Sequence, residues 1–227
     1  EGHGDIYSSF LEGETFSFPV KLKGQINTIS QEGHCSLSPD GKTLYFTSDR
    51  PGGFGGRDIY KAKLMADSTW GNIVNLGDSI NTKYDEDSPF IHPDGASLFY
   101  SSNGPKSSGG YDIFRAYMEL SDSSFKRTEN LGFPINTPDD DIYFVLAANG
   151  TRGYYSSGKA GGEGLKDIYL VETGFEAKNP VLLFVKGKVT FDDVAVESAI
   201  KVEITSKNNA VFNTSKTIPS TGNYMIS

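Results

Sequence analysis

The chain has 227 residues, and 21 Lys and Arg against 29 Asp and Glu give a formal net charge of -8. An acidic balance disfavours nucleic-acid binding, which needs a basic surface, and no apolar run approaches the about 20 residues of a membrane-spanning helix. The single cysteine, Cys35, excludes an internal disulfide framework, and 37% hydrophobic residues are too many for a disordered chain.

The N-terminal residues, Glu1–Tyr7, contain neither the charged nor the apolar region of a signal peptide. We therefore interpret the chain as part of a longer protein, and no targeting segment indicates its compartment.

The rest of the chain is dominated by a repeat with a period of about 54 residues. Three landmarks recur together, which makes chance an implausible explanation. The landmarks are Asp-Ile-Tyr or Asp-Ile-Phe beginning at Asp5, Asp58, Asp112 and Asp167; Pro-Asp-Gly or Ala-Asn-Gly ending at Gly41, Gly95 and Gly150; and Ile-Asn-Thr beginning at Ile26, Ile80 and Ile135.

Within each repeat the pattern is typical of short strands and tight turns. The runs 43–48, 97–102 and 152–157 are rich in β-branched and aromatic residues on both alternating sides, which predicts strands covered on both faces. The Asp-Gly and Asn-Gly pairs before them supply the positive-φ residues of hairpin turns. Gly55, Gly109 and Gly164 recur three residues before each Asp-Ile motif, where we expect the chain to turn back. No convincing helical period occurs.

About four strands in each repeat predict an all-β protein with a β-propeller. The chain represents about four blades of a partial propeller over residues 1–172, of which the N-terminal blade lacks its first two strands but keeps an outer strand near Phe16–Leu22. The polar composition of residues 173–180 predicts a linker. Residues 181–227 show alternating strands and predict the start of a β-sandwich.

The repeat resembles the TolB-type, WD-like Pro-Asp-Gly propeller repeat. The resemblance is carried by Ser38–Arg50 and by Gly52-Gly53-Phe54-Gly55-Gly56 before Asp58-Ile59-Tyr60. Together with Asn75-Leu76-Gly77 it is similar to blades of Bacteroidetes OmpA-family proteins, and Gly187-Lys188-Val189 through Tyr224 resembles the carboxypeptidase-regulatory-like domain that follows them.

The order of propeller and sandwich is similar to that of PorE-like periplasmic components of the type IX secretion system. The resemblance implies a periplasmic, outer-membrane-associated protein whose partners are envelope or secretion-system proteins. It also implies peptidoglycan binding only through a domain outside this sequence.

The most regular carboxylates are Asp58, Asp112 and Asp167. Their recurrence in every blade favours a structural role, in which each accepts backbone N–H bonds and fixes a loop to the neighbouring blade. The alternative is a ring of metal ligands or acids. A catalytic pair needs two different environments, however, and the repeat symmetry argues against that.

A second set of acids, Glu32, Glu86 and Asp141, falls just before each inner strand, where side chains can face a propeller channel or rim. The runs 85–87 and 139–141 contain three carboxylates each and could hold Ca²⁺, although such loops are usually only solvated. The histidines lack paired zinc spacing, and Cys35 at an inner strand is expected to be a small core residue.

These features predict no catalytic residue, cofactor or metal site, and a non-enzymatic scaffold that binds proteins through its loops. Phe54 and Tyr111 are candidate anchors. The alternative function is a carbohydrate-binding or carbohydrate-cleaving propeller that uses Glu32, Glu86 and Asp141.

Overall fold

A computed structural model describes residues 4–12, 15–119, 121, 123–175, 185–190, 198–205, 211–218 and 221–226. Every regular element among them is a β-strand, as predicted. No helix in this part of the chain is long and apolar enough to cross a membrane. The chain divides into two compact units, one of residues 1–7 and 21–181 and one of residues 8–20 and 182–227.

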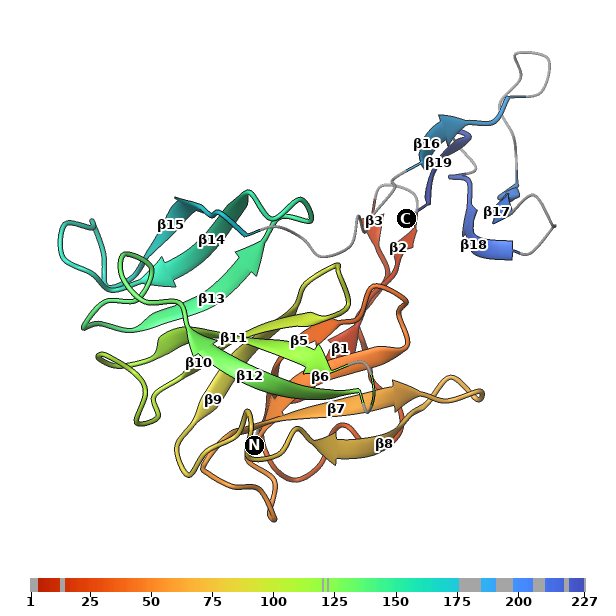
Figure 1. Ribbon diagram of the computed structural model, residues 1–227. Helices are drawn as coiled ribbons and strands as arrows, with labels where there is room; N and C mark the ends of the chain where they lie inside the picture. Colours follow the sequence, from red (N-terminus) through yellow and green to blue (C-terminus); the bar gives the residue numbers. More distant parts are fainter. Residues whose placement is uncertain are drawn as a thin grey trace. The chain divides into compact units, whose positions relative to one another are not determined.

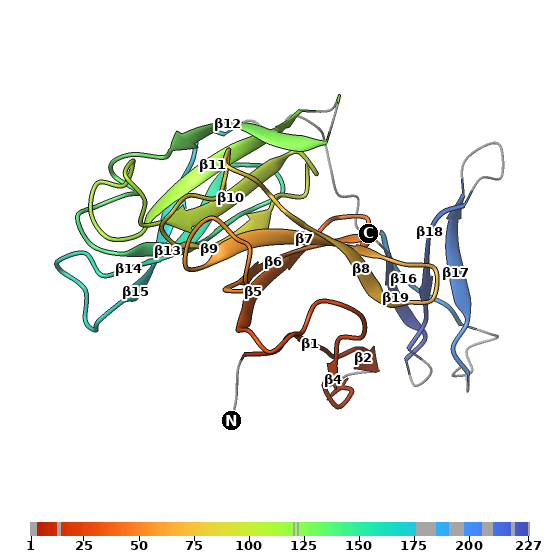
Figure 2. The same cartoon turned by 90° about the horizontal axis from the view of Figure 1, so that it is seen from below.

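The first unit contains three antiparallel blades, each with its strands in chain order (Figure 1). The first blade consists of β5 (Glu32–Leu37), β6 (Thr43–Ser48), β7 (Asp58–Leu64) and β8 (Trp70–Asn75), which run side by side in Figure 2. The second blade consists of β9 (Glu86–Ile91), β10 (Ser97–Ser102), β11 (Asp112–Glu119) and β12 (Ser124–Asn130). The third consists of β13 (Asp141–Leu146), β14 (Arg152–Ser157) and β15 (Asp167–Glu172).

The inner strands of the blades are neighbours, since β9 contacts both β5 and β13. Four-stranded antiparallel sheets arranged around adjacent inner strands are the architecture of a β-propeller. The predicted partial propeller is therefore the fold of this unit.

The middle strands of the first two blades lie between two hydrophobic clusters. All six residues of β6 and of β10 are buried, as the two-sided apolar pattern predicted. The same prediction was wrong for β14, where Tyr155 is buried but Tyr154 is 48% exposed, because no described blade covers its other face. In β10, Tyr100 packs in a cluster with Tyr45 and Ile59 of the first blade, whereas Phe99 packs with Phe144 of the third blade. Consecutive blades are thus held by apolar contacts on opposite faces of one strand.

Each inner strand carries a bulge at the same repeat position. The register shifts next to His34 in β5, opposite Ser88 in β9, and around Tyr143 in β13. Ser88 and Tyr143 have φ angles of 51° and 60°. A bulge turns a side chain away from the regular alternation of a strand, so these positions escape the pattern that buries their neighbours.

The hairpin turns before the middle strands use the glycines that the Asp-Gly and Asn-Gly pairs indicated. Gly41, Gly95 and Gly150 have φ angles of 69°, 64° and 74°. These values lie in the left-handed region that disfavours other residues.

A turn was expected to explain the glycine before each Asp-Ile motif, but the structure gives a different explanation. A Cβ atom on Gly55 would lie 1.8 Å from the Tyr84 carbonyl oxygen of the next blade's loop, and one on Gly109 would lie 2.1 Å from the Pro138 oxygen. At Gly164 the Cβ would meet nothing within 4 Å. The glycine is therefore needed where the following blade approaches the backbone.

The N-terminal strands are short. β1 (Tyr7–Ser8) pairs with β4 (Val20–Lys21), and β2 (Leu11–Glu12) pairs with β3 (Thr15–Phe16). The expected outer strand over Phe16–Leu22 is reduced to β4, and residues 8–20 group with the second unit.

In the second unit, β16 (Val185–Lys188) pairs with β19 (Asn223–Ile226), and β17 (Lys201–Thr205) pairs with β18 (Val211–Lys216). Both pairings are antiparallel, as in a β-sandwich. The predicted strand at Leu183-Phe184 and most of the linker, residues 176–180, lie outside the described residues.

The inter-blade glycines provide a first prediction. Gly55→Ala should destabilise the protein by about 1–3 kcal/mol, because the new methyl group pushes the backbone of the next blade's loop away. Gly164→Ala is the matched control at the same repeat position, and its effect should stay within about 0.5 kcal/mol. Thermal and urea unfolding measure both, and equal losses for the two variants would refute the close-approach explanation.

Candidate functional site

The expected channel or rim acids are buried. Glu32 is 2% exposed, and Glu86 and Asp141 are 0% exposed. The carboxylate of Glu32 accepts bonds from the Thr28 backbone N–H at 2.8 Å, from the Thr28 hydroxyl at 2.7 Å and from the Ser48 hydroxyl at 3.0 Å. This carboxylate therefore fastens the Ile-Asn-Thr segment to its inner strand instead of facing solvent.

The same arrangement recurs in the next two blades. Glu86 accepts from the N–H and hydroxyl of Thr82, both at 2.8 Å, and from the Ser102 hydroxyl at 2.8 Å. Asp141 accepts from the N–H and hydroxyl of Thr137. Burial raises the pKa of Glu86 above its usual value, which these hydrogen bonds oppose. The prediction that these acids face a channel or rim was wrong, because local backbone donors draw them inside.

The Asp-Ile motif begins a hydrogen-bonded network. Asp58 accepts from the backbone N–H groups of Phe54 at 2.6 Å and Gly55 at 3.0 Å, so it holds its own glycine-rich loop. It also accepts from the Asn75 side chain at 2.7 Å, and Asn75 in turn accepts from the Asn81 side chain at 2.7 Å.

Asn81 makes the connection between blades. Its Oδ1 accepts from the Ile59 N–H at 2.8 Å, and its Nδ2 donates to the Ile59 carbonyl at 2.9 Å. Asn136 holds Ile113 through the same pair of bonds, both at 2.8 Å, and Asn27 holds Ile6 at 2.7 and 3.0 Å. The Ile-Asn-Thr motif thus binds each segment to the strand of the preceding blade.

Asp112 and Asp167, the corresponding aspartates of the other two blades, also accept hydrogen bonds from the loops that precede them. Asp112 accepts from the Ser108 N–H and from the Asn130 side chain, both at 2.7 Å. Asp167 accepts from the Glu163 N–H at 2.9 Å. In each blade the carboxylate is directed at backbone N–H groups of the adjacent loop.

The two acidic runs are also engaged in contacts between loops. Asp85 accepts from the Arg57 N–H at 2.9 Å, and Asp140 accepts from the Tyr111 N–H at 3.1 Å and pairs with Lys166 at 3.0 Å. The described residues contain no group of three or more potential metal ligands.

A polar cluster on the three inner strands escaped the sequence reasoning. His34 Nδ1 is hydrogen-bonded to the Asp87 carboxylate, and His34 Nε2 lies 3.0 Å from the Tyr143 hydroxyl. The Arg57 guanidinium pairs with Asp87 at 2.5 Å. His34, Ser88 and Tyr143 occupy the same position in successive repeats, so aligning the repeats could have indicated that these residues lie close together. The three residue types differ, however, and the position therefore does not stand out as a motif.

Cys35 corrects another expectation. It lies on the inner strand β5, but it is exposed and does not belong to the core. Only Glu32 of this strand is buried, because the neighbouring bulge and the inner position leave the other residues accessible.

His92, in contrast to Cys35, is buried. It is 1% exposed, and its Nε2 lies 3.2 Å from the Ala147 carbonyl oxygen of the third blade.

The loops at one end of the blades form a continuous surface, which we call the loop face. It consists of loops 28–31, 49–57, 82–85, 103–111, 137–140 and 158–166. Within the blades, backbone N–H groups of Asp49, Asn103 and Gly158 donate to Gln31, Asp85 and Asp140. Between blades, the Glu86 N–H donates to the Arg57 carbonyl at 2.8 Å, and the Asp141 N–H donates to the Tyr111 carbonyl at 2.6 Å. The loop face is therefore held by the same blade-to-blade contacts as the strands.

The loop face presents apolar side chains to solvent. Ile29, Phe54, Tyr84 and Leu165 are 87%, 50%, 39% and 96% exposed. Tyr111, the other candidate anchor, is half-buried; its burial and the neighbouring Asp85 raise its pKa to about 12. Phe54 is thus the accessible member of the expected pair.

No family model and no curated protein matches the chain. Among solved structures, it is similar to TolB from Acinetobacter baumannii, with a TM-score of 0.47 and 21% identity over 76% of this chain and 36% of that chain. A TolB from Agrobacterium tumefaciens gives a TM-score of 0.43 and 17% identity over 90% of this chain. A puromycin hydrolase mutant gives a TM-score of 0.38 and 10% identity over 79% of this chain.

The chain spans 36%, 55% and 32% of the lengths of these three proteins. The likenesses concern the fold at low identity, and the interpretation of the site rests on the contacts within the chain.

The connection between blades yields a second prediction. Asn81→Asp should lower the free energy of unfolding by at least about 2 kcal/mol, because a buried carboxylate cannot donate to the Ile59 carbonyl or to Asn75. Asn149→Asp is the matched control, since the exposed Asn149 side chain only accepts bonds, from Thr151 at 3.1 and 2.9 Å. Urea unfolding compares them, and equal stability of both variants would contradict the role of the amide donor.

The inner-strand cluster predicts a pH dependence. Burial alone would raise the pKa of Asp87, but the hydrogen bond and charge of His34 and the charge of Arg57 outweigh it and hold this pKa below 3.8. A carboxyl whose pKa is depressed on folding adds stability above its unfolded pKa and loses it as the pH falls through the folded pKa.

The Asp87→Asn variant should therefore be less stable than the wild type at pH 7, and the difference should shrink as the pH falls below about 3.8. Urea unfolding over a pH series measures this, with the exposed Glu163→Gln as control. A difference that stays constant with pH would exclude the proposed ionisation of Asp87.

Proposed function

We propose that this chain is the partner-binding part of a non-enzymatic periplasmic scaffold, and that it binds other proteins through the loop face. The observation that carries the proposal is the division of labour between side chains. The recurrent carboxylates are hydrogen-bonded within and between blades, whereas the loops expose Ile29, Phe54, Tyr84 and Leu165.

Exposed apolar side chains on loops fit a binding surface better than a structural role. Burying such side chains in a partner removes apolar area from water, and neighbouring aromatic residues are the commonest interface anchors. Loops carried on a rigid scaffold are also where binding residues concentrate. The loops 49–57 and 82–85 approach so closely at Gly55 that Phe54 and Tyr84 belong to neighbouring segments.

The wider setting is supported by the repeat motifs and by Gly187-Lys188-Val189 through Tyr224, which resemble OmpA-family proteins of Bacteroidetes. We infer an outer-membrane-associated, peptidoglycan-anchored protein of the type IX secretion system, in which the anchor belongs to a domain outside this sequence. Its partners are then envelope or secretion-system proteins, and 181–227 corresponds to a carboxypeptidase-regulatory-like domain.

The burial of its expected site residues argues against the carbohydrate-cleaving alternative. It required accessible carboxylates at Glu32, Glu86 and Asp141, but these side chains are between 0% and 2% exposed and already hold Thr28, Thr82 or Thr137. A substrate could not reach them without unfolding the Ile-Asn-Thr segments.

The loop face is tested by capture from a Bacteroidetes envelope extract, using the full-length protein that contains this chain. Phe54→Ser should reduce the recovery of cross-linked envelope or secretion-system proteins by about tenfold, since loss of an anchor costs at least about 1–2 kcal/mol. Leu64→Ser is the control, because Leu64 is 41% exposed at the end of β7 opposite to the loop 49–57. Equal recovery with both variants, or no envelope protein with the wild type, would overturn the proposal.

A further inference from the structure

A cation lies against a stacked pair of aromatic rings in the first blade. Phe46 of β6 and Tyr60 of β7 are stacked with ring centroids 6.0 Å apart, and the Arg50 guanidinium carbon lies 5.1 Å from each centroid. Such a position over aromatic faces favours a cation, because the ring faces carry negative charge.

Polar groups complete this guanidinium site. Arg50 Nε donates to the Ser48 hydroxyl at 3.0 Å, and one terminal nitrogen donates to the Ile26 carbonyl at 2.6 Å and to the Glu32 carboxylate at 3.2 Å. The site therefore combines two rings, a hydroxyl, a backbone carbonyl and a buried carboxylate.

The third blade repeats the cation with a different residue. Lys159 occupies the repeat position of Arg50, and both backbone N–H groups donate to the serine at the end of the middle strand. The Lys159 ammonium lies 3.7 Å from the centroid of the Tyr169 ring and donates to the Tyr155 hydroxyl at 2.8 Å. Two blades of the three thus place their own cation on the aromatic pair.

The second blade keeps the framework but has Gly104 at this position. The Gly104 N–H donates to the Ser102 hydroxyl at 3.1 Å, and the rings of Tyr100 and Phe114 are stacked with centroids 5.7 Å apart. Ser102 donates to Glu86, as Ser48 donates to Glu32 in the first blade.

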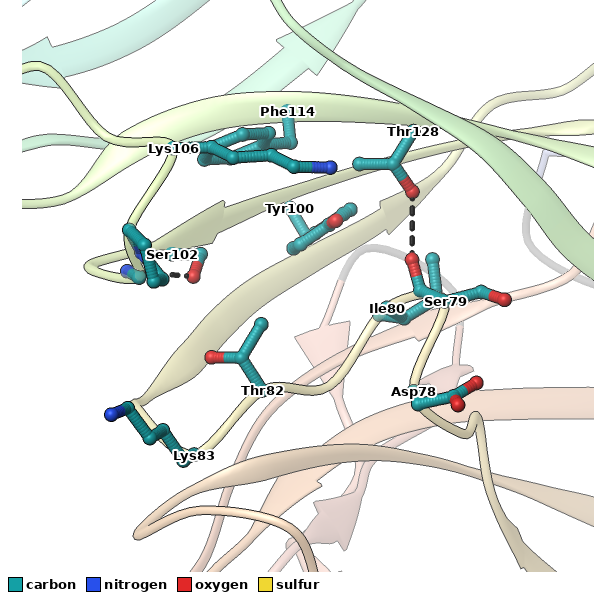
Figure 3. A pocket seen from close by; sticks show the side chains of 12 residues that line it. Asp78, Ser79, Ile80, Thr82, Lys83, Tyr100, Ser102, Lys106, Phe114 and Thr128 are labelled. Carbon is teal, nitrogen blue, oxygen red and sulfur yellow. Dashed lines mark hydrogen bonds between the residues drawn. The ribbon is translucent and has the colours of Figure 1, made fainter.

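Because glycine supplies no side chain, a cavity of about 290 Å³ opens over this aromatic pair (Figure 3). Its lining includes Ile80, Thr82, Tyr100, Ser102, Gly104 and Phe114, which contain the counterparts of the groups around Arg50. The carboxylate of Glu86 lies directly behind Thr82 and Ser102, to which it is bonded.

The mouth of the cavity carries two lysines. Lys83 and Lys106 both line it and are exposed, and neither forms an ion pair with another described residue. Asp78 also lines the cavity and is exposed, so two lysines face one aspartate, and the excess positive charge disfavours a ligand that is only cationic. A ligand with a carboxylate outside and a cation inside matches both parts of the cavity.

We propose that this cavity of the second blade is a binding site for an arginine, whose guanidinium lies against the stacked pair of Tyr100 and Phe114 and whose carboxylate faces Lys83 and Lys106. The guanidinium takes the place that the Arg50 side chain fills in the first blade. It donates to Ser102, to the Ile80 carbonyl and toward Glu86. This site lies on the face between blades and goes beyond the partner-binding role of the loop face.

Calorimetric titration of the whole chain tests the site with three probes. Nα-acetyl-arginine should bind at least about tenfold more tightly than Nα-acetyl-citrulline, which has the same shape without the charge. Nα-acetyl-arginine N-methylamide, which lacks the carboxylate, should bind more weakly than Nα-acetyl-arginine. Equal binding of these two probes would contradict the pairing of the carboxylate with Lys83 and Lys106. Equal affinity for arginine and citrulline, or no binding of either, would overturn the proposal.

A second test uses a variant whose own side chain supplies the cation and fills the site. Gly104→Arg copies the first blade and should abolish binding of Nα-acetyl-arginine, whereas Gly104→Ala adds the same Cβ, 3.1 Å from the Ser102 hydroxyl, and should keep most of it. If Gly104→Arg does not fold, Gly104→Lys copies the third blade for the same purpose. Unchanged affinity in a folded Arg or Lys variant would place the ligand elsewhere. Because the probes are small molecules, this result is independent of protein capture by the loop face.

Discussion

The propeller depends on the side-chain amide that joins one blade to the next. Asn81 satisfies both backbone groups of Ile59, at 2.8 and 2.9 Å, in a place where water does not reach them. Buried backbone groups without partners are costly, and asparagine is the short side chain that can both accept from an N–H and donate to a carbonyl. These bonds fix where the next blade begins, and the apolar clusters pack between the blades that they connect.

Much of the charge in the repeat serves this connection. Asp58 holds the loop before its strand and the Asn75 side chain, and Asn75 accepts from Asn81. Glu32 and Glu86 hold the threonine that follows the motif asparagine. A residue that recurs in every blade is therefore bound into the blade, and chemistry particular to this protein must be sought where the repeats differ.

Two repeat positions differ in this way. His34, Ser88 and Tyr143 stand at the bulges of the inner strands, and there a histidine, an aspartate neighbour and a tyrosine join three blades. Arg50, Gly104 and Lys159 stand after the middle strands, and the glycine opens a cavity that its counterparts fill. In both cases an unchanged backbone carries side chains of different character, so the blades are structurally alike but chemically distinct.

The sequence was sufficient for the all-β repeat, the two-sided burial of strands such as β6 and β10, and the positive φ angles of Gly41, Gly95 and Gly150, because these follow from local periodicity and turn chemistry. It misplaced Glu32, Glu86 and Asp141, and it missed the contact between His34, Asp87 and Tyr143.

Only the tertiary structure decided those features, since an acid before a strand can turn toward solvent or toward a threonine, and the choice depends on where the next segment lies. The inter-blade role of Gly55, the exposure of Cys35 and the cavity over Tyr100 and Phe114 likewise depend on how segments that are distant in the chain pack together. Periodicity reveals which residues are equivalent, but packing between blades determines which of them are buried, paired or accessible to a ligand.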